Sequence, residues 1–600
     1  MLQFPQNIVQ YSFHRLFVLF SVSDMPNTVQ IEVNGRSVDA AQGEMLLSAL
    51  RRVGVDVPTL CNYDGLSPAG ACRVCVVEVE GQRSLVPACA FPVTAGMKIK
   101  TQTDRVVDAR RMIIELLLAD HPDDCLFCER NGNCKLRELA ESFGIRRRRF
   151  IGQRDTYPVD SSGESIVRDP EKCIKCGKCV RVCDEIQGVS CIAFLNRGSK
   201  TTVGTAFDEG MNVSSCINCG QCVTTCPTGA LLAKSHIERV MSALRDPHLH
   251  VVIQHAPSVS ITLGEEFGMS TGADVMGKMH AILRRMGFDA VFDTGFGADL
   301  TIMEEASELV HRIKNKGVLP MFTSCSPGWI KFIETFYPQN IPNLSTCKSP
   351  QAMLGAVIKT YYAEKMGLEP ENIYSVSVMP CTAKKFEASR PEMGRGGVQD
   401  VDAVLTTREL AQMVRRFNLD LDVEPEEADS PFGMRSTAGK IFGATGGVME
   451  AAVRSAYYFL TGRELGDLKV EAVRGLASIK EAHVNIAGKD VGVAVVNGLG
   501  NARRLLNQIN AGTRSDIHLV EVMTCPGGCV GGGGQPYGTD IGKVKMRSRE
   551  LYCIDDTETL RVSHANPEII QLYDEYLGEP NSHKSHELLH THYQRREALM

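Results

Sequence analysis

Two cysteine runs constrain this chain more than any other feature. They read CIKCGKCVRVC from Cys173 and CINCGQCVTTCP from Cys216, and each has the spacing CxxCxxCxxxC. Thiols that only fill a core do not need regular spacing, so the runs indicate metal ligation. Zinc fingers lack so tight a run and its terminal Cys-Pro, so the pattern predicts iron-sulfur clusters.

Together the two runs resemble the bacterial two-cluster ferredoxins, in which the fourth cysteine of each run ligates the other cluster. The resemblance implies a ferredoxin-like domain over residues 161–245 that binds two 4Fe-4S clusters. The implied ligands are Cys173, Cys176, Cys179 and Cys226 for one cluster and Cys183, Cys216, Cys219 and Cys222 for the other.

Cysteine usage as a whole agrees with this prediction. The chain has 22 cysteines among 600 residues and no convincing export signal, which favours metal ligation in a reducing compartment over disulfides. We therefore expect a cytoplasmic protein, with an organelle of an anaerobic eukaryote as a minor alternative. Residues 1–27 are interpreted as a disordered leader or as a mis-assigned start before Met25. The apolar stretch there is too short to span a bilayer.

Length and charge bound the remaining possibilities. A chain of 600 residues is expected to form several domains. A formal charge of −6 gives no electrostatic case for binding nucleic acid or an anionic membrane. The run Arg146–Arg149 is interpreted as a solvated or ligand-facing patch.

Residues 28–104 begin with an alternating strand, an Asn-Gly turn, a second strand and an amphipathic helix, which indicates a small β-rich domain. Four cysteines follow with the spacing Cx10Cx2Cx13C, which resembles the 2Fe-2S loop of plant-type ferredoxins. The resemblance implies a β-grasp domain with one 2Fe-2S cluster, ligated by Cys61, Cys72, Cys75 and Cys89.

Residues 105–160 form a small domain with a mixed ligand set. An apolar helix ends at a His-Pro pair, and the pattern HxxxCxxCxxxxxC follows. Spacing alone does not choose between zinc and an iron-sulfur cluster. With its neighbours we interpret the set as a third accessory 4Fe-4S site, so that four centres in series lead electrons to a terminus where chemistry occurs. The set is His121, Cys125, Cys128 and Cys134.

Residues 246–600 have the pattern of a larger α/β domain, with buried strands alternating with helices. Four cysteines lie here in three separated segments rich in glycine or proline, TSCSPGW, MPCTAKKFE and EVMTCPGGCVGGGGQP. The last can form neither a good helix nor a central strand, so it is expected to bring bare backbone close to something. Three other cysteines of the chain have no cluster-like neighbours and are predicted to be packed thiols. They are Cys191, Cys347 and Cys553.

The three segments, in this order, resemble the signature motifs of the iron-only (FeFe) hydrogenases, and the preceding modules resemble those of the long, multi-cluster members. The resemblance covers Met25 to about Tyr593. It implies an H-cluster, a 4Fe-4S cubane bridged through a cysteine sulfur to a two-iron unit that carries carbon monoxide, cyanide and a dithiolate amine bridge.

The resemblance also assigns residues to this cluster. It makes Cys381, Cys525 and Cys529 cubane ligands, with Cys529 as the bridge, because thiolates suit iron-sulfur ligation. It assigns Lys384 to a hydrogen bond with a cyanide. Met379 and Met523 would pack on the two-iron unit, a use for soft, polarizable side chains.

The first segment departs from the family pattern. The family usually has adjacent cysteines there, one a cubane ligand and one a proton donor, whereas this chain has Cys325 followed by Ser326. By position, Cys325 falls on the donor and Ser326 on the ligand. A serine alkoxide is a poor ligand for an iron-sulfur cluster, so we expect Cys325 to be the fourth ligand. Ser326 or a nearby water would then serve the proton step.

Protons also need a path to the cluster. By resemblance, Glu305, Glu308 and Ser345 fall on a relay of carboxylates and a hydroxyl. The two glutamates are separated by three positions in an expected helix. They therefore share a face and could pass a proton through a bridging water.

The resemblance implies an enzyme that reversibly reduces protons to H2, with electrons from ferredoxin or an NAD(P)-linked partner. No dinucleotide fingerprint follows a strand convincingly, so partner flavoprotein and 2Fe-2S subunits are expected. Maturation proteins would supply the two-iron unit. The alternative is a non-catalytic hydrogen sensor or iron-sulfur assembly factor of the same fold. We expect neither a nucleic-acid partner nor a membrane span.

Overall fold

The computed structural model describes residues 27–151, 154–486 and 488–598. The leader predicted at residues 1–27 therefore lies, except for its last residue, outside the described residues. The chain divides into two compact units. The smaller contains the described residues up to Thr59 together with Arg73–Ile113, and the larger contains Leu60–Cys72 together with the described residues from Ile114 onward.

The smaller unit is built on a five-stranded mixed sheet in the order β2-β1-β5-β3-β4. Asn34 and Gly35 form the predicted turn between β1 and β2, and both have positive φ, 49° and 83°, as tight hairpins require. Strand β1 also pairs in parallel with β5, and helix α1 buries Leu46 and Leu50. This is the predicted β-grasp arrangement. Its elements are β1 (Thr28–Val33), β2 (Arg36–Ala41), α1 (Leu46–Arg52), β3 (Val76–Val79), β4 (Val86–Pro87) and β5 (Lys98–Lys100).

The ferredoxin-like part of the larger unit is an internal repeat. Gly177 and Gly220 precede its two short helices with the same left-handed backbone, φ 70° and ψ 8°. Each CxxC segment therefore has the same turn around its thiols, as the repeated cysteine run predicts. Two helices precede this part, α2 (Asp104–Ala119) and α3 (Lys135–Ser142). Its own elements are β6 (Ile166–Arg168), α4 (Lys178–Arg181), β7 (Ala193–Leu195), β8 (Thr202–Gly204), α5 (Gln221–Thr225) and β9 (Leu231–Ala233).

The region after residue 246 contains two four-stranded sheets. The first is wholly parallel in the order β11-β10-β13-β16, and its strands are almost entirely buried, which explains their nearly continuous apolar sequences. The second has the order β12-β19-β18-β17, with only the β17-β18 pair antiparallel. The strands are β10 (His250–His255), β11 (Ala290–Asp293), β12 (Met321–Phe322), β13 (Ile373–Met379), β16 (Ala403–Thr406), β17 (Ile479–Ile486), β18 (Lys489–Asn497) and β19 (Ile517–Met523).

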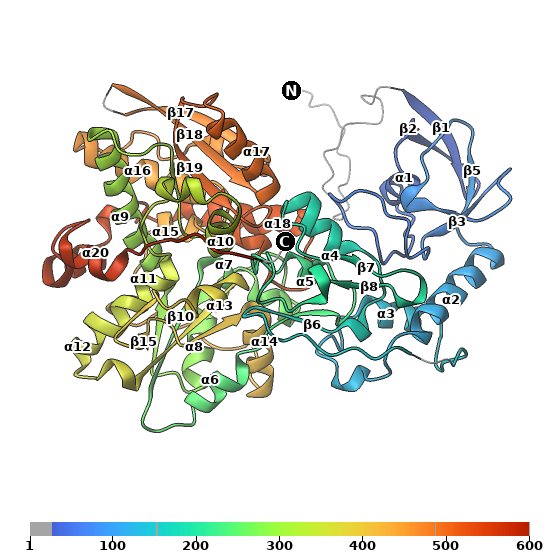
Figure 1. The fold of residues 1–600 in the computed structure, drawn as a ribbon, viewed down its shortest axis with the longest axis horizontal. Helices are drawn as coiled ribbons and strands as arrows, with labels where there is room; N and C mark the ends of the chain where they lie inside the picture. The colour runs from blue at the N-terminus through green and yellow to red at the C-terminus, as the bar shows by residue number, and fades with distance from the viewer. Residues whose placement is uncertain (1–26, 152–153, 487, 599–600) are drawn as a thin grey trace, which may run out of the picture. The chain divides into compact units, whose positions relative to one another are not determined.

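Helix α9 (Thr294–Lys314) is the central helix of this region and is buried over most of its length. It packs mainly against three other helices, labelled around it in Figure 1, namely α11 (Pro350–Val357), α15 (Thr437–Ile441) and α16 (Gly447–Thr461). Other helices here are α8 (Met276–Arg285), α10 (Pro327–Phe336), α13 (Ala383–Ala388), α14 (Thr407–Arg416), α17 (Leu499–Asn510), α18 (Ile541–Thr557), α19 (Pro567–Leu572) and α20 (His583–Leu589).

The strands end where the cysteine segments begin. Cys325, Cys381 and Cys525 each follow the carboxyl end of a strand, β12, β13 and β19 respectively. Ligands bind at this edge in open α/β sheets. Among the described residues, no helix is both long and apolar enough to cross a bilayer.

Candidate active site: a thiol-lined cavity and a carboxylate path

The three cysteine segments meet around one cavity of about 90 Å³. Its lining is mostly apolar, and the cysteines of the three segments lie in the loops that follow the strands. The cavity brings together the predicted residues Cys325, Ser326, Met379, Cys381, Lys384, Met523, Cys525 and Cys529, together with Cys219 of the ferredoxin-like part.

The glycines of the third segment have a role that the sequence did not reveal. A Cβ atom on Gly532 would lie 2.2 Å from the carbonyl oxygen of Pro380, and one on Gly533 would lie 2.4 Å from that of Cys219. No side chain fits at such distances. The glycine run therefore lets this loop contact the backbone of two other cysteine-bearing loops, which draws their thiols toward one cavity.

Burial controls the charge state of these thiols. It raises the pKa of Cys529 to about 12, with the nearby Cys381 adding to the rise, and it raises the pKa of Cys525 and Cys325 as well. Several adjacent thiolates are costly in a buried cavity unless a cation offsets them. The donor set therefore fits a cationic iron-sulfur centre, because thiolate ligands and iron compensate each other.

Lys384 is held in place by specific partners. Its Nζ donates to Ser349 Oγ at 2.6 Å and to Glu387 Oε2 at 2.8 Å, and it lies 3.4 Å from the carbonyl oxygen of Cys325. Glu387 and Ser349 were not identified from the sequence. The only indication of Glu387 in the sequence is its position, three residues after Lys384 on helix α13.

Cys325 and Ser326 have different surroundings. Ser326 Oγ lies 2.8 Å from Thr524 Oγ1, so its hydroxyl is already hydrogen-bonded. The Cys325 thiol is close enough to Glu305, Cys529 and Lys384 for their charges to affect its pKa. Cys325 is therefore close both to the other thiols and to the predicted proton path.

Glu305 lies on α9 and is fully buried. Its Oε1 accepts from the backbone N–H of Ser324 at 3.1 Å and from the Ser324 hydroxyl at 3.3 Å. Within the described part of the chain, its Oε2 has no hydrogen-bond partner. Burial raises the pKa of Glu305 to about 7, the N–H of Ser324 opposes the rise, and the negative Glu308 adds to it. A carboxyl group that titrates near neutral pH can both take up and release a proton.

Glu308 is more exposed than Glu305, with 13% of its side chain accessible to solvent. Its Oε1 accepts from Arg312 Nη2 at 2.6 Å, and its Oε2 accepts from Ser345 Oγ at 2.9 Å. The three residues predicted for the relay, Glu305, Glu308 and Ser345, therefore lie close together. Ser324 and Arg312 were missed by the sequence reasoning, although both are neighbours in sequence of residues that it did identify.

Two further cavities contain the predicted ligand sets of the ferredoxin-like part. One is lined by Cys173, Cys176, Cys179 and Cys226, and the other by Cys183, Cys216, Cys219 and Cys222. The repeat extends to the backbone, because Lys175 N–H points at Cys173 Sγ and Asn218 N–H at Cys216 Sγ, both at 3.4 Å. Cys219 lines both its own cavity and the larger one.

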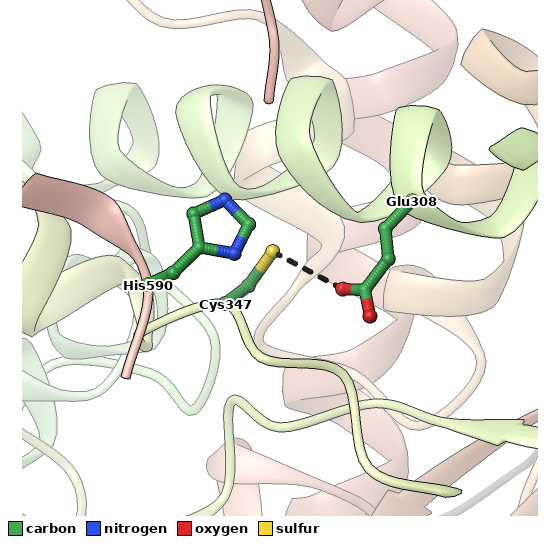
Figure 2. Close-up of side chains that lie close together, drawn as sticks. All are labelled: Glu308, Cys347 and His590. Atoms are coloured by element: carbon green, nitrogen blue, oxygen red, sulfur yellow. Dashed lines mark hydrogen bonds between the residues drawn. The ribbon is translucent and has the colours of Figure 1, made fainter. Parts of the chain in front are cut away.

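The prediction of packed thiols is confirmed for Cys191 and Cys347, which are buried, and is wrong for Cys553. Cys553 is exposed, because it lies on a solvent-facing side of α18. Cys191 is buried, as predicted, but it does have cluster-like neighbours, since its N–H lies 3.4 Å from Cys183 Sγ and it lines the same cavity. Cys347 is fully buried, and its Sγ lies 3.8 Å from Glu308 Oε2 (Figure 2).

The mixed ligand set is only partly assembled around one space. His121, Cys125 and Cys134 line a common cavity together with Arg146–Arg149. Cys128 is not part of that lining, and its Sγ lies close to Gly229. Burial lowers the pKa of His121 and so favours a neutral imidazole, the form that binds metals.

The predicted 2Fe-2S ligands are all buried. In the larger unit, Cys72 N–H lies 3.5 Å from Cys61 Sγ. In the smaller unit, Cys75 immediately precedes β3, and Cys89 lies on the short turn after β4. Their cluster remains a prediction from spacing.

Comparison with known protein families covers most of the chain. The family model "Iron only hydrogenase large subunit, C-terminal domain" matches residues 249–533, and "Iron hydrogenase small subunit" matches residues 541–596. A "2Fe-2S iron-sulfur cluster binding domain" matches residues 26–104, an "NADH-ubiquinone oxidoreductase-G iron-sulfur binding region" matches residues 110–149, and a "4Fe-4S dicluster domain" matches residues 172–230.

Individual proteins are similar along nearly the whole chain. "NADP-reducing hydrogenase subunit HndD" of Solidesulfovibrio fructosivorans is 47% identical, covering 95% of this chain and 99% of that protein. "Iron hydrogenase 1" of Clostridium pasteurianum is 43% identical, covering 94% and 100%. Among solved structures, an apo [FeFe]-hydrogenase HydA1 variant from Chlamydomonas reinhardtii is 43% identical with a TM-score of 0.55, covering 61% of this chain and all of that one.

Assembly factors are more distant. The "Cytosolic Fe-S cluster assembly factor narfl" of Xenopus tropicalis is 33% identical and covers 58% of this chain and 74% of that protein.

Proposed function

Because this chain belongs to the iron-only hydrogenase family and is an iron hydrogenase, an oxidoreductase, we propose that it reversibly reduces protons to H2 at the thiol-lined cavity. The observation that carries this proposal is the convergence of three strand-end loops on one buried space, to which they contribute four thiols. The cavity is apolar with few polar groups, which suits a cofactor that carries small diatomic ligands.

In this proposal Cys325, Cys381, Cys525 and Cys529 would hold the cubane of an H-cluster. Cys529 would be the ligand shared with a two-iron unit that carries carbon monoxide, cyanide and a dithiolate amine bridge. When bound, this group supplies the iron at which protons and electrons combine. The chain itself positions it. Lys384, fixed by Glu387 and Ser349, would donate to a cyanide, and Met379 and Met523 would pack on the two-iron unit.

Glu308, Ser345 and Glu305 form the proton path. Glu308 takes a proton from solvent, the Ser345 hydroxyl joins it to the interior, and Glu305 delivers the proton to the cavity. The unpartnered Oε2 of Glu305 is the atom available for this proton among the described groups. Arg312 holds Glu308 Oε1, which leaves Oε2 directed toward the serine.

The predicted ligand sets would hold one 2Fe-2S and three accessory 4Fe-4S clusters, which would pass electrons toward the cavity. Cys219 supports the last step, because it lines both its own cluster cavity and the large cavity. The electron source is ferredoxin, an NAD(P)-binding flavoprotein with a 2Fe-2S subunit, or both. The similarity to a subunit named for NADP reduction supports the second source.

The assignment of Cys325 as fourth cubane ligand rests on thiolate chemistry and on the hydrogen bond that already engages Ser326. We expect Cys325→Ser to lose the cubane signal in electron paramagnetic resonance, and Ser326→Ala to keep it. The reverse result would make Ser326 the ligand and Cys325, beside Glu305, the proton donor.

The proposed function is tested by anaerobic maturation of the full chain followed by an assay of H2 evolution with a chemical reductant. We expect turnover together with infrared bands of iron-bound carbon monoxide and cyanide. A hydrogen sensor or assembly factor of the same fold would show no substantial turnover. One observation supports the alternative of a sensor or assembly factor, namely the serine at position 326.

A further inference from the structure

Three side chains outside the cysteine motifs meet beside the proton path. Glu308 comes from α9, Cys347 from the loop before α11, and His590 from the end of α20. One potential ligand atom from each lies within 4.8 Å of the other two. Figure 2 shows the thiol of Cys347 between the imidazole ring and the carboxylate.

The three donors suit one class of metal ion. A thiolate, an imidazole and a carboxylate are all zinc ligands, whereas calcium and magnesium require oxygen donors. Ligand atoms about 2.0–2.3 Å from a tetrahedral zinc ion lie roughly 3.5 Å apart. The 3.8 Å between Cys347 Sγ and Glu308 Oε2 is close to this separation.

The surrounding groups already fix the donors in suitable orientations. Arg312 binds Oε1 of Glu308, so Oε2 faces the thiol. His590 Nε2 lies 3.1 Å from Glu304 Oε2, which leaves Nδ1 as the ligand atom. A metal ion there would replace the present contact of Nδ1 with the Thr346 hydroxyl, at 2.8 Å. A carboxylate behind a histidine is the usual support of a metal-binding imidazole.

Glu304 is itself firmly held. It is fully buried and accepts from Tyr573, Ser585 and the backbone N–H of Asn581 at 2.8 Å. The histidine is therefore anchored from the side opposite the thiol. This arrangement distinguishes the cluster from three donors that are close by chance.

We propose that Glu308, Cys347 and His590 bind a zinc ion that closes the proton path. The thiol proton is released to solvent on binding, water takes the fourth position, and the two anionic ligands balance the charge of the ion. The metal engages Glu308 Oε2, the atom that accepts from Ser345. The binding site stands on geometry alone, whereas the inhibition also rests on the proposed relay.

The binding test uses the full chain with its clusters assembled, washed with a chelator and then equilibrated anaerobically with zinc chloride. We expect the wild type to retain about one more zinc ion per chain than Cys347→Ala. Zinc X-ray absorption should show one sulfur and otherwise nitrogen or oxygen ligands. The affinity of Cys347→Ala should fall at least tenfold, because loss of even a ligand's hydrogen-bonding partner costs about 10- to 100-fold.

Cys553→Ser is the matched control, because Cys553 is an exposed thiol far from this cluster in the sequence. It should retain zinc like the wild type. His590→Gln provides a second variant if Cys347→Ala loses iron. Equal zinc retention by the wild type, Cys347→Ala and His590→Gln would overturn the site.

Assays of H2 evolution test the proposed inhibition separately from zinc binding. Zinc should inhibit H2 evolution by the wild type and Cys553→Ser, a chelator should restore it, and Cys347→Ala should resist inhibition. Zinc bound at the three residues without any inhibition would keep the site and refute the relay through Glu308. Inhibition that is equal in Cys347→Ala would refute closure of the path by this site.

Discussion

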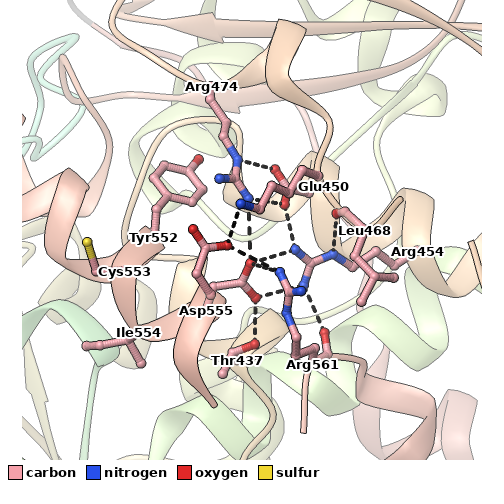
Figure 3. A network of polar contacts seen from close by, with 12 residues as sticks. Thr437, Glu450, Arg454, Leu468, Arg474, Tyr552, Cys553, Ile554, Asp555 and Arg561 are labelled. Atoms are coloured by element: carbon pink, nitrogen blue, oxygen red, sulfur yellow. Dashed lines mark hydrogen bonds and ion pairs between the residues drawn. The ribbon is translucent and has the colours of Figure 1, made fainter. Parts of the chain in front are cut away.

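Buried carboxylates in the region after residue 246 differ in whether they can change their charge near neutral pH. Asp555 and Glu450 lie among three arginines, and Figure 3 shows the resulting network. Asp555 accepts from Arg454 at 2.8 and 2.9 Å and from Arg561 at 2.9 Å. These guanidinium groups hold its pKa well below the usual range against the opposing effect of burial.

Glu305 is equally buried but has no guanidinium partner among the described residues. Two hydrogen bonds from Ser324 do not compensate for burial, so its pKa rises to about 7. The difference shows what separates a structural carboxylate from one that can carry protons. Cationic partners fix the charge of Asp555, whereas their absence leaves Glu305 free to change its charge.

The largest expected effect comes from Glu305→Gln. The amide keeps the shape and can still accept from Ser324, but it cannot carry a proton. Turnover should fall about 100-fold or more, the typical contribution of a positioned acid or base. Anaerobic H2 evolution measures this, with iron content per chain as the control.

If Glu305→Gln matches the wild type, Glu305 lies outside the path and its raised pKa is only a consequence of burial.

Asp555→Asn should act on stability. It leaves Arg454 and Arg561 without their shared carboxylate in a buried site, and breaking such a pair costs about 3–5 kcal/mol. Denaturant unfolding under anaerobic conditions would measure the loss. Glu305→Gln, which removes no ion pair, should cause no comparable loss. Comparable losses in both variants would contradict the distinction between the two groups.

Glu308→Gln should have a smaller effect than Glu305→Gln, because Glu308 is nearer to solvent and water can partly replace it. The amide oxygen can still accept from Ser345, but proton exchange with solvent is slowed. Turnover should drop, and the iron content should stay the same. A variant with full turnover would remove Glu308 from the relay.

The smallest expected effect is a dependence of the folding stability on pH. The pKa of Glu305 rises from 4.5 to about 7 on folding, so the native state holds a proton that the unfolded chain has lost in this range. Its contribution to stability therefore declines as the pH rises from about 4.5 to 7. Asp555, with a lowered pKa, behaves in the opposite way, and its contribution is lost only in strong acid.

Infrared titration tests this directly. The stretch of a protonated buried carboxyl should disappear with a midpoint near pH 7 in the wild type, and this step should be missing in Glu305→Gln. An unchanged titration in the variant would assign the step to another group.

Much of the site was predictable because its information is local. Cysteine runs place ligands at fixed intervals, and both ferredoxin-like sets appear around cavities as their spacing predicts. The turn at Asn34-Gly35 is also a short-range signal. Exposure of Cys553 was not predictable, since an isolated cysteine carries no information about the face of its helix.

The cluster modules, the three thiol-bearing segments and the spacing of the two glutamates could be predicted from the amino-acid sequence, because each depends on residues that are near one another in the chain. Which groups from distant segments meet could be known only from the folded protein. Folding places Ser324 on Glu305, Arg312 on Glu308, and His590 and Cys347 beside the same carboxylate. Charge state follows from such contacts. Two buried carboxylates therefore differ in pKa because of partners brought together by folding, which no local pattern records.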